Sequence, residues 1–135
     1  MFGKSLNTTK IGTAVVFLAL FFCGSVWAEG LVNKNPIAES ADKRFANYGD
    51  GTILDRKNGL LWMTRDYWQM EAKWVNWYTA NEYAQRMSNK NFAGYRDWRL
   101  PTPEEAATLY DRRKRNVDKD GDKIFIDSMF PEGAG

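Results

Sequence analysis

A short basic segment is the first candidate for binding chemistry. Four consecutive cations form the one local basic cluster of the chain: Arg112, Arg113, Lys114 and Arg115. Guanidinium groups bind sulfate and phosphate through paired hydrogen bonds, so the cluster predicts a binding site for a polyanionic glycan or an anionic cell surface. The alternative is a solvated helix end, where cations favour the negative pole of the helix dipole. Asp111 and Asp118 lie close enough to weaken a positive field.

A calcium loop is the second candidate, in "NVDKDGDKIFID" (116–127). Oxygen ligands fall at the spacing of a calcium-binding loop, with a glycine between them. The ligands would be Asn116, Asp118, Asp120, Asp122 and Asp127. The pattern departs from the usual loop because its first residue is not acidic and its last is Asp rather than Glu. The alternative is an Asp/Gly turn that leads into a strand. Calcium is the one cofactor that the sequence suggests.

Aromatic side chains are the third candidate, since they stack on sugar rings as readily as they pack in a core. Four of them lie near one another in the sequence: Tyr67, Trp68, Trp74 and Tyr78. In a small domain without disulfides, the alternative is that they form the core.

The chain has few side chains that are suited to catalysis. The chain has no histidine and one cysteine, Cys23. Ser-His-Asp and Cys-His catalysis are therefore excluded, as are zinc thiolate sites beyond that cysteine. No pair of carboxylates, lysines or tyrosines is placed to suggest another reaction, so we expect a protein that is not an enzyme.

The N-terminus predicts export. Lys4 and Lys10 precede or flank the apolar run 11–23, and Val26-Trp27-Ala28 fits a signal-peptidase site, so residues 1–28 read as a cleavable signal peptide. A membrane anchor is the alternative, although the apolar run is short for a span of about 20 residues. A lipoprotein anchor at Cys23 is a further one. We expect a secreted, periplasmic or cell-envelope protein without a stable membrane span after cleavage.

The charge balance argues against nucleic acid as a partner. Two of the 19 basic residues lie in the expected signal peptide, and the remaining 17 equal the 17 acidic residues. Without net positive charge, the mature chain has no general affinity for a phosphate backbone.

Several elements must position these residues. Residues 29–43 are polar, which predicts a flexible lead. Residues 44–135 are expected to form a single domain. Apolar runs at 52–54 and 60–63 flank an Asn-Gly turn and predict a hairpin. Asn76 predicts the cap of a helix over 77–88, with one apolar face made by Trp77, Ala80, Ala84 and Met87.

The segment "GYRDWRLPTPEE" (94–105) leads into a second helix. Thr102, Pro103 and Glu105 form a capping box with proline at the first helical position, which predicts a helix over 103–111. Trp98 is expected to anchor the core. Arg96 or Arg99 is expected to pair with Asp97 or with loop carbonyls.

These motifs, in this order, resemble the Lcl C-terminal domain family, which is named for the C-terminal domain of a bacterial collagen-like adhesin. The resemblance covers about residues 44–130. It rests on Arg44-Phe45, Asp50-Gly51-Thr52, Gly59-Leu60-Leu61-Trp62, Trp77 with Ala80, and Gly94 through Thr102.

The resemblance implies an α+β, C-type-lectin-like fold, with two helices packed on a small irregular antiparallel sheet. Its structural signature residues are Trp62, Trp77, Asp97, Trp98, Arg99 and Pro101. The family's cysteines near Ala84 and the C-terminus are absent. Members normally continue beyond "FPEGAG", so a truncated domain with an incomplete sheet is expected.

The resemblance also implies a function. The named adhesin binds sulfated glycosaminoglycans, which favours an exported, non-catalytic binding or adhesion module for anionic glycans. The alternative is a structural domain that docks an envelope protein, or a truncated fragment without function.

Overall fold

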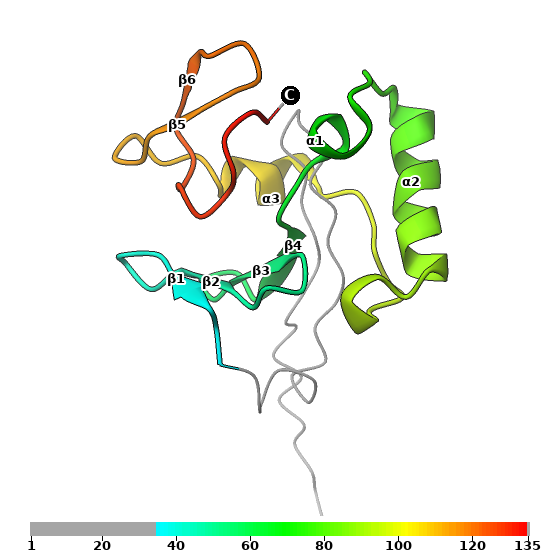
Figure 1. Ribbon diagram of the computed structural model, residues 1–135, viewed down its shortest axis with the longest axis horizontal. Coiled ribbons are helices and arrows are strands. Elements are labelled where there is room, and N and C mark those ends of the chain that lie inside the picture. The colour runs from blue at the N-terminus through cyan, green and yellow to red at the C-terminus, as the bar shows by residue number, and fades with distance from the viewer. Residues whose placement is uncertain (1–34, 135) are drawn as a thin grey trace, which may run out of the picture.

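The computed structural model describes residues 35–134, and the expected signal peptide lies outside them. Its largest element is an antiparallel sheet in the order β1-β2-β3-β4. The strands are β1 (Ala38–Glu39), β2 (Phe45–Asn47), β3 (Thr52–Asp55) and β4 (Leu60–Met63). The chain is therefore α+β, as expected, because helices follow the sheet (Figure 1).

The predicted hairpin is confirmed. Ile53 pairs with Trp62 and Leu54 with Leu61 across β3 and β4. Gly59 closes the turn with a φ of 65°, a left-handed conformation that glycine adopts without strain. Every residue of β4 is buried, so both of its faces are covered, and a run of four apolar residues suits this strand.

The sheet begins earlier than expected. β1 lies inside the segment predicted as a flexible lead, and Ala38 and Glu39 pair with Asn47 and Ala46 of β2. The composition of this polar segment does not indicate a strand. The strand forms because its backbone pairs with β2, a contact that the segment's own sequence does not contain. Strand pairing thus begins at residue 38, within the segment 29–43.

Three α-helices and a 3-10 turn follow the sheet. They are α1 (Tyr67–Glu71), α2 (Trp77–Asn89), η2 (Phe92–Gly94) and α3 (Pro103–Ala107). A second, two-stranded sheet is formed by β5 (Asn116–Val117) and β6 (Lys123–Ile124). In Figure 1, α3 lies above the main sheet, α2 stands to one side of it, and the β5–β6 hairpin lies above α3.

The predicted helix caps are confirmed. Asn76 accepts a hydrogen bond from the backbone of Thr79, and Thr102 and Glu105 form a reciprocal capping box. α3 is shorter than expected and ends at Ala107, so the following basic cluster does not lie on a helix. The helix α1 was not predicted, although Asp66 and Gln69 form a capping box of the same spacing.

The buried face of α2 differs from the predicted face at the start of the helix. Ala80, Ala84 and Met87 are buried as expected, but Trp77 is 67% exposed and Tyr83 takes its place in the core. The Tyr83 ring packs edge-on against Tyr67 of α1 at 5.0 Å between centroids. Burial raises the pKa of the Tyr83 hydroxyl.

The core joins residues far apart in the sequence. Phe130 packs edge-on against both Phe45 and Trp62, with centroid distances of 5.3 and 6.3 Å. All three side chains are at most 1% exposed. Trp98 is buried as predicted, and its indole N–H donates to the carbonyl of Phe92.

A buried carboxylate organises the hairpin turn. Asp55 is fully buried and forms a two-pronged ion pair with Arg44, at 2.9 and 2.6 Å. The same carboxylate accepts from the Lys57 backbone and the Asn58 amide. Asn58 also donates to Thr108, just after α3. The network therefore fixes the turn of the hairpin against the end of a helix.

Arg99 of the family signature contacts the same helix, α3. Arg99 pairs with Glu105 at 3.0 Å and donates to the carbonyl of Leu100 at 2.7 Å. The loop-carbonyl contact was expected, whereas Glu105 was not among the predicted partners. Glu105 accepts in turn from the backbone of Thr102, so Arg99 supports the capping box.

A second ion network ties the two ends of the described chain. The Lys114 ammonium lies 2.7 Å from Asp42 and 2.6 Å from Asp127. The Asp127 side chain is 4% exposed, so Lys114 neutralises a buried charge. The two carboxylates, Asp127 first, raise the pKa of Lys114, and the Lys114 contact lowers the pKa of Asp42 well below its usual range.

We expect Asp55→Asn to lower the free energy of unfolding by about 3–5 kcal/mol, because it leaves the Arg44 guanidinium without its buried counter-charge. Urea unfolding measures the change. The matched control is Glu39→Gln, which breaks the exposed Arg56–Glu39 pair and should cost about 0–1 kcal/mol. Equal losses in the two variants would contradict the central role of Asp55.

The Lys114 network predicts a pH-dependent stability. Asp42 has a lowered pKa in the folded chain, so its contribution is present above the unfolded pKa of about 3.9 and is lost as the pH falls. Lys114 has a raised pKa, so its contribution is present below about 10.4 and is lost as the pH rises through the folded value. The stability difference between the wild type and Lys114→Met should therefore be largest from about pH 5 to 9.

Thermal melts of both proteins across this pH range measure that difference. A difference that stays constant from about pH 2 to pH 7 would show that the contacts of Lys114 do not depend on ionised carboxylates.

Candidate functional site

The basic segment 112–115 lies in a turn between α3 and β5. The backbone N–H of Asp111 donates to Phe125, which fixes the turn against the β5–β6 hairpin. The side chains of Arg112, Arg113 and Arg115 are exposed, while Lys114 turns inward to its two aspartates. We call the three exposed arginines the arginine turn.

The three arginines differ in the number of hydrogen bonds and ion pairs that their guanidinium groups already form. Arg113 forms a two-pronged pair with Asp111, at 3.0 and 2.7 Å, and this pair lowers the pKa of Asp111 well below its usual range. Arg115 donates to the carbonyls of Arg112 and Lys114, and its guanidinium lies 4.9 Å from the centre of the Phe125 ring. Within residues 35–134, the Arg112 side chain forms no hydrogen bond or ion pair.

The turn can therefore present a cationic surface with donors in fixed positions. Arg115 is held in place by two carbonyls and an aromatic face, which reduces the entropy that a ligand contact would remove. Arg112 retains its full set of donors, and the Arg113 side chain is 85% exposed. Lys114 is no part of this surface, because both of its carboxylate partners belong to the fold.

The residues of the predicted calcium loop do not converge. The Asn116 amide is buried and donates to the carbonyls of Asp127 and Phe130. Asp127 is paired with Lys114 and accepts from the Met129 backbone. In the part of the chain that the structure describes, no three His, Cys, Asp or Glu side chains come together as a metal site.

The middle of that loop is an Asp/Gly turn. Asp118 accepts from the backbone N–H groups of Asp120 and Asp122, so its carboxylate holds the turn closed. The Asp120 carboxylate pairs with Lys119. Four of the predicted calcium ligands thus have a structural partner, which agrees with the turn alternative: Asn116, Asp118, Asp120 and Asp127.

The aromatic residues divide between core and surface. Tyr67 is buried, whereas Trp74, Trp77 and Tyr78 are 73%, 67% and 73% exposed. Trp68, which is half-buried, lies 5.2 Å from Trp74 between ring centroids, at an interplanar angle of 47°. Trp77 and Tyr78 form a second pair, edge to face at 5.2 Å.

These two ring pairs lie in consecutive segments, from α1 to the first turn of α2. We call the four residues the aromatic platform: Trp68, Trp74, Trp77 and Tyr78. The structure corrects two expectations here, since Tyr67 leaves the surface set and Trp77 joins it. Trp77 is the first residue of α2 and is exposed, although the 3.6-residue periodicity places it on the buried face of the helix. Periodicity gives the face on which a residue lies, but it does not say how far along the helix that face is covered.

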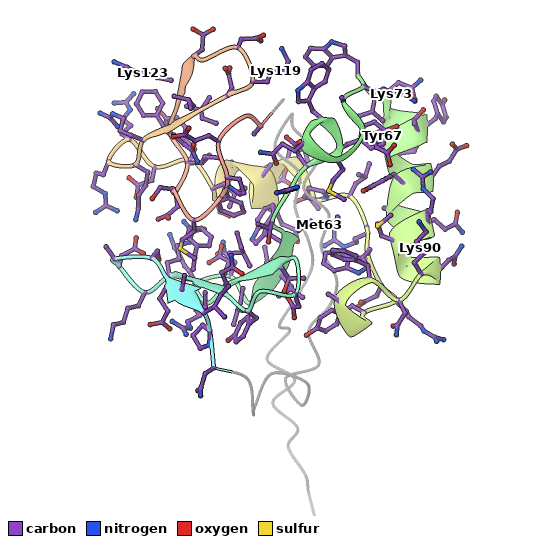
Figure 2. All side chains as sticks on the ribbon, in the orientation of Figure 1. Met63, Tyr67, Lys73, Lys90, Lys119 and Lys123 are labelled. Carbon is purple, nitrogen blue, oxygen red and sulfur yellow. The ribbon has the colours of Figure 1, made fainter. Side chains whose placement is uncertain are left out.

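Lys119 was not among the predicted site residues. Its ammonium lies 4.7 Å from the centre of the Trp74 ring and 5.2 Å from that of Trp68. Figure 2 shows Lys119 on the side of the β5–β6 hairpin that faces α1, with Lys123 on the far side. The hairpin thus supports the platform from the side through a cation–π contact.

An apolar cavity of about 310 Å³ opens between the main sheet, α1 and η2. Its lining includes four large apolar side chains and one arginine: Ile37, Met63, Met70, Phe92 and Arg65. It contains none of the predicted site residues. Among residues 35–134, no helix is long and apolar enough to cross a membrane.

Comparison with known proteins agrees with the motifs and the architecture. No curated protein and no solved structure matches the chain. The sequence model of one family, described as the Lcl C-terminal domain, matches residues 51–134. This span contains the hairpin, all three α-helices, the arginine turn and the aromatic platform, and it is most of the chain. The protein therefore belongs to the Lcl C-terminal domain family, a domain associated with a bacterial adhesin.

Proposed function

We propose that this protein is an exported, non-catalytic adhesion module that binds sulfated or otherwise anionic glycans through the arginine turn. The observation that carries the proposal is the geometry of Arg112, Arg113 and Arg115. Three guanidinium groups are exposed on one short turn, and Arg112 forms no hydrogen bond or ion pair within residues 35–134. Membership of an adhesin-associated family supports the same function.

Guanidinium chemistry favours sulfate over other partners of the turn. A sulfate group presents several oxygens with fixed geometry, and the arginine fork matches two of them at once. Asp111 already occupies this geometry on Arg113, at 2.7 and 3.0 Å. The Arg113 side chain is 85% exposed and the Asp111 side chain 20%, so water reaches the pair and weakens it. A multiply charged glycan can therefore displace Asp111 without a large penalty.

Lys114 is left out of the proposed site, although the sequence suggested it. Its ammonium lies within 2.7 Å of each of two carboxylates. Removing it would break the network that holds Asp127, so its substitution tests stability rather than binding. The site is therefore three arginines on a turn whose position Lys114 fixes.

The location, the fold and the non-catalytic role each have support of their own. An exported location agrees with the adhesin-associated family and with the N-terminal pattern of residues 1–28, which lie outside the described residues. The C-type-lectin-like fold that the resemblance implies agrees with the α+β order of elements. A non-catalytic role agrees with a chain that has no histidine.

We expect the triple variant Arg112→Ala/Arg113→Ala/Arg115→Ala to lose about tenfold or more in affinity for heparin, the probe for a sulfated glycan. Three exposed ion pairs of about 0.2–1 kcal/mol each would together give a loss of this size. Salt-gradient elution from heparin resin measures it. Wild-type retention should fall as salt rises beyond about 0.15 M, where the Debye length is about 8 Å.

A matched control separates the site from net charge. Lys57, Lys90 and Arg96 are exposed cations on three other parts of the described surface. Replacing these three with alanine removes the same total charge and should leave most of the retention in place. Equal losses in the two triple variants, in proteins with unchanged near-ultraviolet circular dichroism, would refute a localised glycan site.

A further inference from the structure

The aromatic platform is exposed beyond what folding requires. Trp74, Trp77 and Tyr78 lie within five positions, and each exposes about two thirds or more of its side chain. Exposed apolar side chains that gather in one segment mark binding sites in soluble proteins, because their exposure to water is unfavourable. The core does not need these rings, since it is filled by Trp62, Tyr83 and other buried side chains.

The rings are held in place although they are exposed. Trp74 packs against Trp68, and both lie within 5.2 Å of the Lys119 ammonium. Lys119 is itself fixed, because its backbone N–H donates to Ala134 and its side chain pairs with Asp120. Ordering before binding lowers the entropic cost of a contact, so the Trp68–Trp74 part of the platform is prepared for a ligand.

The charges around the platform are balanced, which favours an uncharged ligand. Glu71 and Lys73, of opposite charge, are both exposed beside Trp74 in the sequence. Within residues 35–134, Lys119 is the cation that lies over these rings; it is paired with Asp120, and its side chain is only 14% exposed. The arginine turn differs, because it carries three exposed guanidinium groups.

The chemistry of the exposed groups narrows the ligand further. The platform consists of flat aromatic rings, of which the indoles and the phenol carry a polar group. A pyranose ring has an apolar C–H face of about the area of an indole and a rim of hydroxyl groups. Its face can stack on Trp74 or Trp77, while its hydroxyls reach polar groups nearby such as Asn76, which is exposed.

We propose that the aromatic platform is a second binding site, which takes an uncharged sugar ring of a polysaccharide by stacking. The site is independent of the arginine turn and does not rest on it. The two surfaces would allow one domain to hold a neutral and an anionic polysaccharide at different places.

The test is affinity electrophoresis of the full chain through gels that contain neutral polysaccharides: dextran, hydroxyethylcellulose or galactomannan. At least one should retard the wild type. Trp77→Ala/Tyr78→Ala should weaken that binding about tenfold or more, since stacking on one aromatic face carries an effect of this size in other ligand classes. This variant leaves the Lys119 contacts intact, so it keeps the test valid if Trp74→Ala alters the fold.

Two controls identify the site. Tyr110 is an exposed aromatic that packs on Phe125 and belongs to neither ring pair of the platform, so Tyr110→Ala should bind like the wild type. The triple arginine variant should lose heparin retention and keep its retardation by the neutral polysaccharide.

Failure of the proposal would be visible in three ways. No retardation by any of the three polysaccharides would overturn it, as would equal retardation of the wild type and Trp77→Ala/Tyr78→Ala. A sedimentation-velocity experiment in which the wild type self-associates and this variant does not would overturn it as well, because the platform would then be a contact between copies of the chain.

Discussion

The buried Arg44–Asp55 ion pair is the contact on which the arrangement of the domain depends. A fully buried carboxylate is tolerated only when its charge and its lone pairs are satisfied. Asp55 receives donors from Arg44, the Lys57 backbone and Asn58, and Asn58 extends the network to Thr108. Thr108 donates to the carbonyl of Glu105, the partner of Arg99. One chain of polar contacts thus links the second strand, the hairpin turn and the third helix.

This network gives the family motifs a common physical purpose. The Arg-Phe motif supplies the guanidinium and a core ring, and Asp-Trp-Arg-Leu-Pro-Thr supplies a buried indole and the support of a helix cap. These motifs therefore specify the scaffold. The Trp77 motif differs, because Trp77 is 67% exposed and belongs to the aromatic platform, while Ala80 is buried.

Local features of the fold could be predicted from the sequence, because their causes are local. The Asn58-Gly59 turn and the caps at Asn76 and Thr102 each depend on residues within three or four positions. The inward turn of Lys114 could not be predicted, since its partners Asp42 and Asp127 are remote or lie beyond a hairpin. The same reason explains β1, whose order comes from pairing with β2.

The packing of Phe130 has a consequence for how the chain folds during synthesis. Its ring closes against Phe45 and Trp62, which leave the ribosome much earlier. Tyr67, Tyr83, Trp98 and Leu109 join the same core earlier in synthesis, but the Phe130 ring is still missing from it. Contacts between residues this far apart in the sequence form slowly. The core of a nascent chain should therefore stay incomplete until the segment around Phe130 has emerged.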